Sequence, residues 1–588
     1  MDRDVSARPL RVLGLIILLL VLILAGRLWQ VQVVHGDHYL RLSEQNRIRV
    51  YPTTAPRGTI VDRRGRALVS NRPSFTVSIL PMEVRDARQV YQTLAGLVGL
   101  SSEEIAAKVA EGQARPFEPV RIRRDVPLEV VTAIEERRVD LPGVLIYAEP
   151  VRLYPEGRLA AHAIGYLGEI SEEELRDLRA RGYRVGDLIG KAGVERVYDQ
   201  ALRGEDGRLR VEVDAAGRPV QMLGAIPPRQ GNSLALSLDL GLQQAAEAAL
   251  GTQVGAVVAM DPWTGEILAM ASWPPYDPNA FAVGISSRTW GRISGDPGRP
   301  LVNRAVDAAY EPGSAFKIVT ALAALEEGIA SRRTSVFCSG TYQLGNWVFK
   351  DWKAHGRVNF IEGIAQSCNV MFWTLGRAVG PERLHRYATM LGLGSLTGID
   401  LPVETAGLIP SPQWKQRVRK EVWFPGETLN TAIGQGYVQV TPLQMARALS
   451  ALVNGGRLLR PRMVRAILTP EGKAVETFRP EATGRLDFSA ESLATLREGL
   501  VAVVSRGTGN AASVAGLAIG GKTGSAENPR GEPHAWFVGY APADHPRVVL
   551  AVMVEHGRRG GVTAAPIAKR MFEAALGDVV EPAVPQKP

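Results

Sequence analysis

Hydrophobic residues run without a charge from Val12 to Gly26, and no other segment of the sequence is long and apolar enough to span a bilayer. With the flanking residues as far as Trp29, the run reaches about 20 residues, the length that a helix needs to cross the hydrocarbon core. The pattern therefore predicts a transmembrane anchor at residues 12–29. The three arginines in the tail before it, residues 1–11, favour a cytoplasmic N-terminus.

A cleaved signal peptide is the alternative interpretation of this apolar run. Its hydrophobic region would be long, and the small residues Ala25 and Gly26 do not form the usual cleavage pattern. We therefore favour a retained single-pass anchor. The rest of the chain, from about residue 30, is then expected on the outer side of the membrane.

Short apolar runs and charged amphipathic segments alternate over residues 30–232. A helical stalk is expected at residues 28–50, and a strand, turn and strand at residues 55–70, with the turn at Asp62–Gly65. Charged helices are expected at residues 101–111 and 171–181. Because no catalytic constellation is visible here, we interpret residues 30–232 as a juxtamembrane stalk and a non-catalytic pedestal domain.

The pattern changes near Ser233. A helix is expected at residues 241–250, followed by two apolar strands around a turn within residues 255–272. A second pair of strands is expected within residues 534–555, and most of the sequence between the pairs has a helical pattern. The economical fold for residues 233–579 is an α+β domain, in which one antiparallel sheet is built from both ends and carries helices on both faces. The tail, residues 580–588, shows no helix or strand periodicity and is expected to be unstructured.

Composition excludes several classes of protein. Hydrophobic residues make up 45% and charged residues 22% of the chain, which is typical of folded domains. The net charge is +9, but the basic residues are interspersed with acidic residues and do not form a basic block. Nucleic acid is therefore not an expected partner. Two cysteines do not make a disulfide framework, and the absence of an HExxH pattern excludes a zincin.

The first candidate for chemistry is Ser314-Ala-Phe-Lys317, which opens an expected helix at residues 314–327. Residues three apart share a helix face, so the hydroxyl and the ammonium are expected to meet. The apolar residues around Lys317 favour desolvation, which lowers the pKa of a lysine and suits it to act as a base. Taken alone, such a motif is more often a helix cap beside a solvated lysine.

Two further motifs follow in the chain. Ser367-Cys-Asn369 lies on an expected break between two helices, and by itself it would be read as an ordinary turn. Lys522-Thr-Gly524 lies among small residues, which let a substrate backbone approach an edge strand. The segment Gly516–Thr523 also matches a P-loop, but the residues after it break a helix and lead into a strand, so we reject a nucleotide-binding function.

The order SxxK, SxN, KTG is that of penicillin-binding proteins and class A β-lactamases. The sequence resembles the class B penicillin-binding proteins over nearly its whole length, including Arg57-Gly-Thr-Ile-Val-Asp-Arg-Arg-Gly and Ala432-Ile-Gly-Gln-Gly. The resemblance implies a serine-type D-Ala-D-Ala transpeptidase, which cross-links peptidoglycan at the bacterial inner membrane. The region from Asp351 to Gly356 looks most like the elongation-type members. A division-type member and a β-lactam sensor are the alternatives.

The resemblance also implies a role for each motif residue. Ser314 would form the acyl-enzyme, Lys317 would take its proton, Ser367 would relay a proton to the leaving D-alanine, and Asn369 would hold the peptide amide and Lys317. The substrate carboxylate and the oxyanion would be held by the strand residues Lys522, Thr523, Gly524 and Ser525. β-Lactams should acylate the nucleophile and remain bound. Glu427 resembles a deacylating glutamate only with altered spacing, so we interpret it as structural.

A metal site is a separate hypothesis. Zinc-ligand side chains recur at Cys338, Asp351, His355 and Cys368. Asp351 and His355 are spaced to share a helix face, and Cys368 lies inside the SxN motif, so a zinc ion would brace the wall of the active site. The alternatives are two unpaired buried cysteines with a surface histidine, or a disulfide. Catalysis itself is expected to need no cofactor.

The resemblance finally implies a partner in the membrane. This is a RodA-type SEDS glycosyltransferase, contacted by the transmembrane helix and the pedestal, which would activate it. The remaining expected ligands are peptidoglycan stem peptides and β-lactams.

Overall fold

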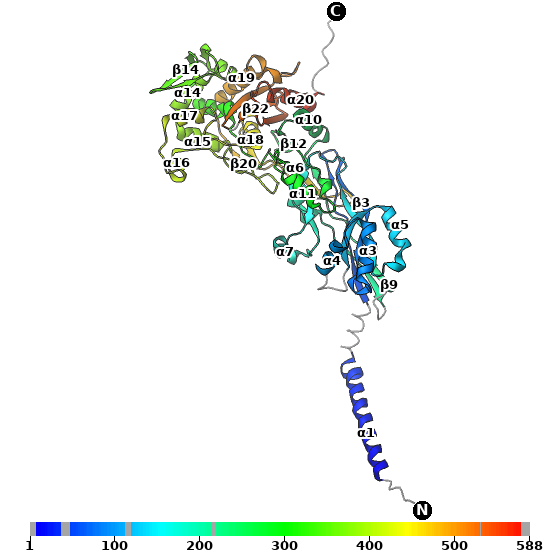
Figure 1. Cartoon of the computed structure of the whole chain (residues 1–588). Coiled ribbons are helices and arrows are strands. Elements are labelled where there is room, and N and C mark those ends of the chain that lie inside the picture. The colour runs from blue at the N-terminus through cyan, green and yellow to red at the C-terminus, as the bar shows by residue number, and fades with distance from the viewer. Residues whose placement is uncertain (1–7, 37–47, 112–118, 214–218, 530, 578–588) are drawn as a thin grey trace, which may run out of the picture. The chain divides into compact units, whose positions relative to one another are not determined.

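The computed structural model describes residues 8–36, 48–111, 119–213, 219–529 and 531–577 (Figure 1). The chain folds into two compact units and passes between them several times. The first unit contains Met1–Pro56, Pro73–Val151 and Gly204–Gln230, and the second contains Arg57–Arg72, Arg152–Arg203 and Gly231–Pro588.

The first unit begins with the helix α1 (Arg8–Trp29), whose apolar side chains are exposed along its length. Over Arg11–Val34 the mean hydropathy is 2.7, and no other helix among the described residues is long and apolar enough to cross a membrane. The predicted stalk continues as the π-helix η1 (Gln30–Val34), and part of it falls on residues 37–47, outside the described residues. The helical prediction is wrong at residues 48–50, because β1 (Ile48–Thr53) pairs there with a neighbouring strand.

The rest of the first unit consists of strands and helices around one apolar core. A three-stranded sheet has the order β1-β8-β9, and β3 pairs with both β4 and β5. The predicted helix at residues 101–111 is confirmed as α4. The bounds are β3 (Ala67–Ile79), η2 (Pro81–Glu83), α3 (Ala87–Val98), α4 (Ser102–Glu111), β4 (Val120–Val126), α5 (Leu128–Glu136), η3 (Arg138–Asp140), β5 (Val144–Leu153), β8 (Gly207–Val213) and β9 (Pro219–Ile226).

The second unit is organised by a five-stranded antiparallel sheet in the order β12-β11-β23-β22-β21. Its strands come from both ends of the segment, as the apolar pattern predicts, and the bounds are β11 (Gly255–Met260), β12 (Ile267–Trp273), β21 (Gly520–Asn528), β22 (Gly531–Ala541) and β23 (Val548–Val554). Because β21 ends the order, one of its edges is open. This edge carries the Lys522-Thr-Gly524 motif.

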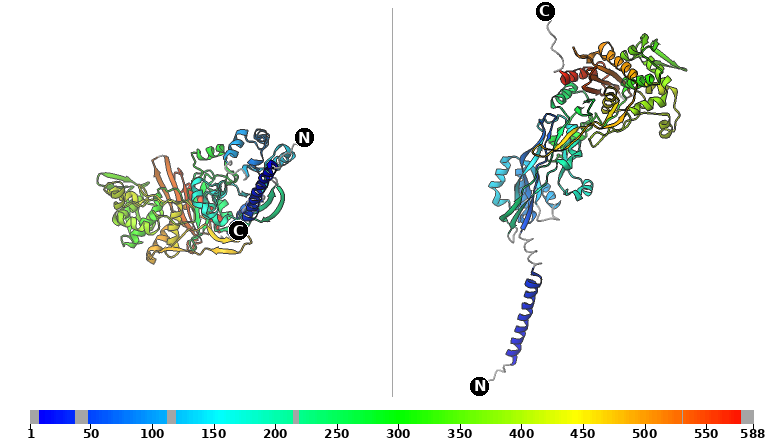
Figure 2. Two further views of the ribbon diagram at one scale, coloured as in Figure 1. Left: turned by 90° about the horizontal axis from the view of Figure 1, so that it is seen from below. Right: turned by 180° about the vertical axis from the view of Figure 1, so that it is seen from behind.

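Helices cover both faces of this sheet, as predicted. Most apolar residues of α10 (Leu240–Leu250) and α20 (Ala564–Leu576) pack in one core, and most of those of α18 (Pro442–Val453) and α19 (Ala490–Arg506) pack in the other. Figures 1 and 2 show these helices around β22 in three views. Alternate residues of each strand point into two separate apolar cores. Val258 belongs to one of these cores and Val257 to the other.

The second unit contains further short helices and strands besides this sheet and its helices. Their bounds are β2 (Ile60–Val61), α6 (Ala161–Ile164), β6 (Leu167–Glu169), α7 (Glu172–Leu178), η4 (Arg179–Arg181), β7 (Leu188–Gly190), α8 (Gly193–Val197), α9 (Asp199–Leu202), β10 (Ser233–Leu236), η5 (Pro278–Ala280), α11 (Ser287–Ser294), η6 (Gly313–Phe316), α12 (Lys317–Glu326), β13 (Ser335–Cys338), β14 (Thr341–Leu344), β15 (Trp347–Lys350), β16 (Gly356–Asn359), α13 (Phe360–Ala365), α14 (Asn369–Val379), α15 (Pro381–Met390), α16 (Pro412–Val418), α17 (Pro425–Ala432), β17 (Arg457–Leu459), β18 (Val464–Leu468), β19 (Ala474–Thr477), β20 (Ala482–Arg485) and η7 (Asn510–Ala512).

The predicted turn at residues 62–65 is confirmed. The amide of Gly65 donates to the carbonyl of Asp62 over 3.0 Å, and Gly65 has a φ of +83°, which favours glycine. The Asp62 side chain accepts from the backbone amides of Arg64 and Arg66, both over 2.8 Å. One aspartate therefore fixes the turn between β2 and β3.

A buried ion-pair network lies next to this turn in the second unit. Glu195 is fully buried, and its two carboxylate oxygens pair with Arg57 and Arg152, each over 2.7 Å. Arg57 also pairs with Asp199 over 2.7 Å. Because a buried carboxylate is stable only when it is paired, the first arginine of the Arg57-Gly-Thr-Ile motif has a structural role.

Candidate active site

The candidate nucleophile lies on the short 3-10 helix η6, which continues directly into α12. Ser314 is partly exposed, whereas the residues around it are buried. The helix predicted at residues 314–327 is therefore present, with its first turn wound more tightly. This tight turn leaves the Ser314 hydroxyl accessible at the surface of an otherwise closed core.

Lys317 lies one turn further along and is 1% exposed. Its ammonium donates to the carbonyl of Ser367 over 2.8 Å, to the hydroxyl of Ser367 over 3.2 Å and to Oδ1 of Asn369 over 2.6 Å. Burial lowers the pKa of Lys317 to about 8, against an opposing effect of Asp351 and Cys368. A direct hydrogen bond to Ser314 is not among the contacts of the described residues.

Ser367 occupies the break between α13 and α14, where the sequence predicts it. Its φ of +56° is unusual for a residue with a side chain. The strained backbone directs its hydroxyl between two ammonium groups, 3.2 Å from Lys317 and 3.0 Å from Lys522. Backbone strain of this kind is common at functional sites and persists only where the surroundings enforce it.

Lys522 and Thr523 lie on the edge strand β21. Lys522 is fully buried, and its ammonium donates to the Ser367 hydroxyl and to the Thr523 carbonyl, each over 3.0 Å. Burial and the neighbouring charge of Lys317 lower the pKa of Lys522 well below its usual value. The Thr523 hydroxyl lies 2.7 Å from the hydroxyl of Thr508, a partner that the sequence does not indicate.

Two glycines allow η6 and β21 to approach each other closely. A Cβ atom on Gly313 would lie 2.5 Å from the carbonyl oxygen of Ser525, and one on Gly524 would lie 2.4 Å from that of Pro312. Gly313 also has a φ of +52°. The backbones around Ser314 and Ser525 are thereby brought close together, as an oxyanion hole formed by their two amides would require.

A third glycine supports the nucleophile from below. The amide of Gly313 donates to the carbonyl of Gly434 over 3.0 Å, and a Cβ atom on Gly434 would lie 2.3 Å from the carbonyl oxygen of Gly313. The Thr320 hydroxyl donates to the Ala432 carbonyl over 2.7 Å. The Ala432-Ile-Gly-Gln-Gly motif therefore forms the floor of the site, a role that spacing alone does not reveal.

Glu427 has structural contacts, in agreement with its interpretation from the sequence. Its carboxylate accepts from the amide of Phe424 over 2.7 Å at the start of α17. It also pairs with the buried ammonium of Lys415 over 2.6 Å. A carboxylate occupied in this way is not placed to activate water at the acyl-enzyme.

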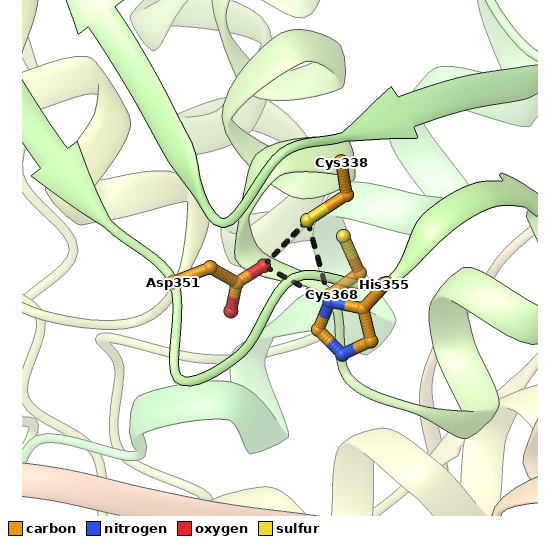
Figure 3. Close-up of side chains that lie close together, drawn as sticks. All are labelled: Cys338, Asp351, His355 and Cys368. Carbon is orange, nitrogen blue, oxygen red and sulfur yellow. Dashed lines mark hydrogen bonds and ion pairs between the residues drawn. The ribbon is translucent and has the colours of Figure 1, made fainter.

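The four candidate metal ligands converge on one point, as Figure 3 shows. Their ligand atoms all lie within 4.8 Å of one another. Cys338 Sγ lies 3.5 Å from Asp351 Oδ2 and 3.3 Å from His355 Nδ1, and the last two atoms are 3.4 Å apart. Both cysteines are free thiols.

One detail of this prediction is wrong. Asp351 and His355 do not share a helix face, because they lie on the loop between β15 and β16. The strand pairs β14-β15 and β13-β16 bring Asp351 and His355 to Cys338, and Cys368 comes from the start of α14. Asp351 also accepts from the backbone amide of Val370 over 3.2 Å, so the cluster is joined to the start of α14, which carries Asn369.

Family models match both parts of the chain. The penicillin-binding protein transpeptidase domain matches residues 255–573, and the penicillin-binding protein dimerisation domain matches residues 52–236. The peptidoglycan D,D-transpeptidase MrdA of Acinetobacter baumannii is 37% identical over 95% of this chain and 86% of its own length. MrdA of Escherichia coli is 32% identical over 96% of this chain and 93% of its own length.

Solved structures give the same result. A complex of penicillin-binding protein 2 (PBP2) with MreC from Helicobacter pylori contains a chain with a TM-score of 0.79 and 27% identity, covering 90% of this chain and 99% of that one. PBP2 of Pseudomonas aeruginosa, bound to WCK 5153, has a TM-score of 0.70 and 32% identity, covering 92% of this chain and 100% of its own. A structure described as a peptidoglycan synthase complex that coordinates polymerization and crosslinking has a TM-score of 0.72 and 32% identity, covering 99% of this chain and 100% of its own.

Proposed function

The chain belongs to the penicillin-binding proteins, as an elongation-type peptidoglycan D,D-transpeptidase, and from this premise we propose which of its residues carry out the reaction. The observation that supports the assignment best is that the ammonium groups of Lys317 and Lys522 both donate to the hydroxyl of Ser367. The three motifs of the family meet at this atom. The assignment of Ser314 as the nucleophile follows from its place one turn before Lys317.

In the acylation step, Ser314 Oγ attacks the carbonyl carbon of the penultimate D-alanine of a stem peptide. The hydroxyl proton passes to Lys317, which can accept it because its pKa is lowered to about 8. The amides of Ser314 and Ser525 stabilise the oxyanion. The C–N bond then breaks, and the amine of the terminal D-alanine leaves with a proton relayed through the hydroxyl of Ser367.

The terminal carboxylate of the substrate is held by Lys522 and Thr523. A carboxylate beside Lys522 favours the charged form of this lysine and offsets the loss of its hydration. The open edge of β21 and Gly524 leave room for the peptide backbone of the substrate. Asn369 holds the peptide amide of the substrate and orients Lys317.

In the second step, an amine of a neighbouring stem peptide attacks the acyl carbonyl. A C–N bond forms, the bond to Ser314 Oγ breaks, and the amine proton returns to Ser314 through Lys317. The carboxylate of Glu427 is bound to the amide of Phe424 and to the ammonium of Lys415. It is therefore not proposed as a base that activates water for hydrolysis of the acyl-enzyme. β-Lactams, which leave no diffusible leaving group, should therefore remain attached.

Covalent labelling with a fluorescent penicillin tests this assignment. The full-length protein in detergent should form a stable adduct, and both Ser314→Ala and Lys317→Ala should lose it. Glu498→Gln, on the exposed surface of α19, is the matched control and should be labelled like the wild type. An adduct that persists in Ser314→Ala would show that the nucleophile is another residue.

We further infer that Cys338, Asp351, His355 and Cys368 hold a structural zinc ion. Zinc–ligand bonds of about 2.0–2.3 Å place the ligands of a tetrahedral ion about 3.3–3.8 Å apart. The separations of Cys338, Asp351 and His355, between 3.3 and 3.5 Å, agree with this requirement. The ion would fix the loop that carries Asp351 against the start of α14, and catalysis would use no metal chemistry.

Metal analysis of the purified protein tests the zinc site. We expect about one zinc ion per chain, lost in Cys368→Ser together with a lower thermal midpoint. His545→Ala removes an exposed histidine outside the cluster and should leave the metal content unchanged. A wild-type protein without stoichiometric zinc contradicts the inference.

We also propose the location of the protein in the cell and its protein partner. The apolar helix α1 would anchor it in the inner membrane, with residues after about 30 on the periplasmic side. Its partner would be a RodA-type SEDS polymerase, contacted by α1 and by the pedestal. Relatives found in complexes with MreC and in a peptidoglycan synthase complex support a role in such an assembly. We retain domain boundaries of 30–232 for the pedestal and 233–579 for the transpeptidase domain.

A further inference from the structure

Two glutamates lie next to the active-site elements, one just before η6 and the other near the end of β21. Glu311 precedes the nucleophile by three residues, and Glu527 follows Ser525 by two. The backbone of Glu311 is held in place because its carbonyl accepts from Trp536 Nε1 over 2.9 Å. Neither glutamate has a role in the acylation step described above.

The side chain of Gln435 shows that the two glutamates are neighbours. With its amide nitrogen assigned from the surrounding donors and acceptors, Gln435 donates to Glu311 Oε2 over 2.8 Å and accepts from the backbone amide of Glu527 over 3.1 Å. The amide of Gly436 also donates to the Glu311 carboxylate. Gln435 and Gly436 belong to the motif that forms the floor of the active site, so these contacts orient Glu311 at the cleft.

The pair lacks a compensating cation within the part of the chain that the structure describes. No arginine or lysine of that part forms an ion pair with Glu311 or Glu527. The hydrogen-bond partners of the Glu311 carboxylate, Gln435 and Gly436, are neutral and do not compensate its charge. Burial and the charge of Glu527 raise the pKa of Glu311 to about 7. Two such carboxylates are stabilised when a cation binds between them.

The reaction itself supplies a cation of the right kind. A transpeptidase joins the acyl group of one stem peptide to an amine of another, and this amine is a primary ammonium in free solution. The side chain of the diamino acid carries the same group when that stem peptide is the acyl donor. A donor ammonium would belong to the peptide bound along β21, and an acceptor ammonium to the peptide that approaches the acyl-enzyme.

We propose that Glu311 and Glu527 bind the primary ammonium of the diamino acid in the stem peptide, and so make the cleft selective for stem peptides that carry this amine. The proposal rests on the assignment of Ser314 as the nucleophile and adds a specificity determinant to it. Glu311 is the principal residue, because its carboxylate is half-buried and oriented, whereas Glu527 is exposed and reinforces the negative charge.

The test compares pentapeptides with a free and with an acetylated side-chain amine, each ending in D-Ala-D-Ala, with meso-diaminopimelate or L-lysine at the third position. One arm measures the rate of acylation of the full-length protein by each peptide. The other arm starts from an acyl-enzyme formed with an acetylated donor and offers only the free-amine peptide as acceptor, because an acetylated amine cannot attack. It measures the ratio of cross-linked to hydrolysed product in the wild type and in each variant. The first arm reports a donor ammonium and the second an acceptor ammonium.

In the donor arm we expect the free-amine peptide to acylate the wild type about five- to tenfold faster than the acetylated peptide, or in the acceptor arm a cross-linking ratio about five- to tenfold above that of Glu311→Gln, as for a partly exposed charge pair. Glu311→Gln should bring the donor preference close to one or lower the cross-linking ratio by this factor, Glu311→Asp should retain part of the effect, and Glu527→Gln should reduce it. Glu532→Gln, an exposed glutamate of β22, is the matched control and should leave the ratio unchanged.

The ratio of the acylation rates with the free and the acetylated peptide separates a loss of specificity from a loss of folding, because a disturbed fold lowers both rates equally. An equal ratio in the wild type and in Glu311→Gln, in both arms, overturns the proposal. Labelling of Ser314 by penicillin is measured on the same samples. If that labelling is absent in the wild type, the nucleophile assignment fails instead.

Discussion

At the scale of single residues, the site depends on two lysines that donate hydrogen bonds to the same serine hydroxyl. Lys317 and Lys522 are both buried, and both donate to the hydroxyl of Ser367. Burial lowers the pKa of both lysines, and the charge of Lys317 lowers that of Lys522 further. This arrangement makes Lys317 available as a base near neutral pH.

The lowered pKa of Lys317 predicts the pH dependence of acylation. Only the neutral amine can accept the proton of Ser314, and its fraction rises as the pH approaches about 8. The second-order rate constant of penicillin acylation should therefore rise roughly tenfold per pH unit below this value and level off above it. Stopped-flow measurement with a fluorescent penicillin checks this, and a rate that is flat between pH 6 and 8 contradicts it.

Gly313 gives a second prediction at this scale. Gly313→Ala would place a Cβ atom 2.5 Å from the Ser525 carbonyl and would separate the two amides of the oxyanion hole. Loss of one such donor typically lowers the rate by about 10²–10³, and we expect a loss of this size in penicillin acylation. Gly328→Ala is the matched control, because Gly328 also has a positive φ, +65°, but open space around it. Equal rates in the two variants would contradict the role of Gly313.

At the scale of elements, the ion pairs of Glu195 show what the Arg57-Gly-Thr-Ile motif does. Arg57→Ala would leave part of the charge of Glu195 buried without a partner. Such a break typically costs about 3–5 kcal/mol, so the thermal midpoint of the full-length protein should fall by several degrees. Arg64→Ala removes an exposed arginine of the same motif, paired with Asp239, and should shift the midpoint little. A similar shift in both variants would contradict the structural role of Arg57.

The same scale shows which features are visible in the sequence. The strands β11 and β23 are predicted because each is a continuous apolar run, which is the pattern of a strand buried on both faces. The break that holds Ser367 is visible because apolar periodicity stops there. The stalk is mispredicted at residues 48–50, because pairing of β1 with β8 outweighs local helical pattern.

Features that depend on distant segments are not visible in the sequence. Spacing suggests that Asp351 and His355 share a helix, whereas cross-strand pairing brings them to Cys338, and the start of α14 supplies Cys368. The hydroxyl contact between Thr508 and Thr523, and the contact of Gly434 with Gly313, join residues with no sequence signal in common. The motifs thus identify the reactive groups, and only the fold identifies their supports.

At the scale of the whole molecule, the first unit carries exposed apolar residues that a soluble spacer would not need. Val220, Met222 and Ile226 of β9 are each more than half exposed, on a strand that ends its sheet. Exposed apolar edges of this kind mark interaction sites. We therefore expect β9 to contribute to the proposed contact with the polymerase.

Substitution of this strand should separate the two activities of the assembly. The double variant Val220→Ser, Met222→Ser should lower glycan polymerisation by the reconstituted polymerase complex severalfold while penicillin labelling stays unchanged. Val139→Ser, at an isolated and almost fully exposed position of the same unit, is the control. Unchanged polymerisation in the double variant would exclude β9 from the contact.

The most direct test of the account is to map the acyl-enzyme formed with a stem peptide. The full-length protein is mixed with a D-Ala-D-Ala pentapeptide, quenched in acid, digested with trypsin and analysed by mass spectrometry. We predict a tetrapeptide adduct on residues 305–317, a tryptic fragment in which Ser314 is the only serine, together with release of one D-alanine per adduct. An adduct on a different fragment, or release of D-alanine without any adduct on this one, would contradict the central claim that Ser314 is the nucleophile.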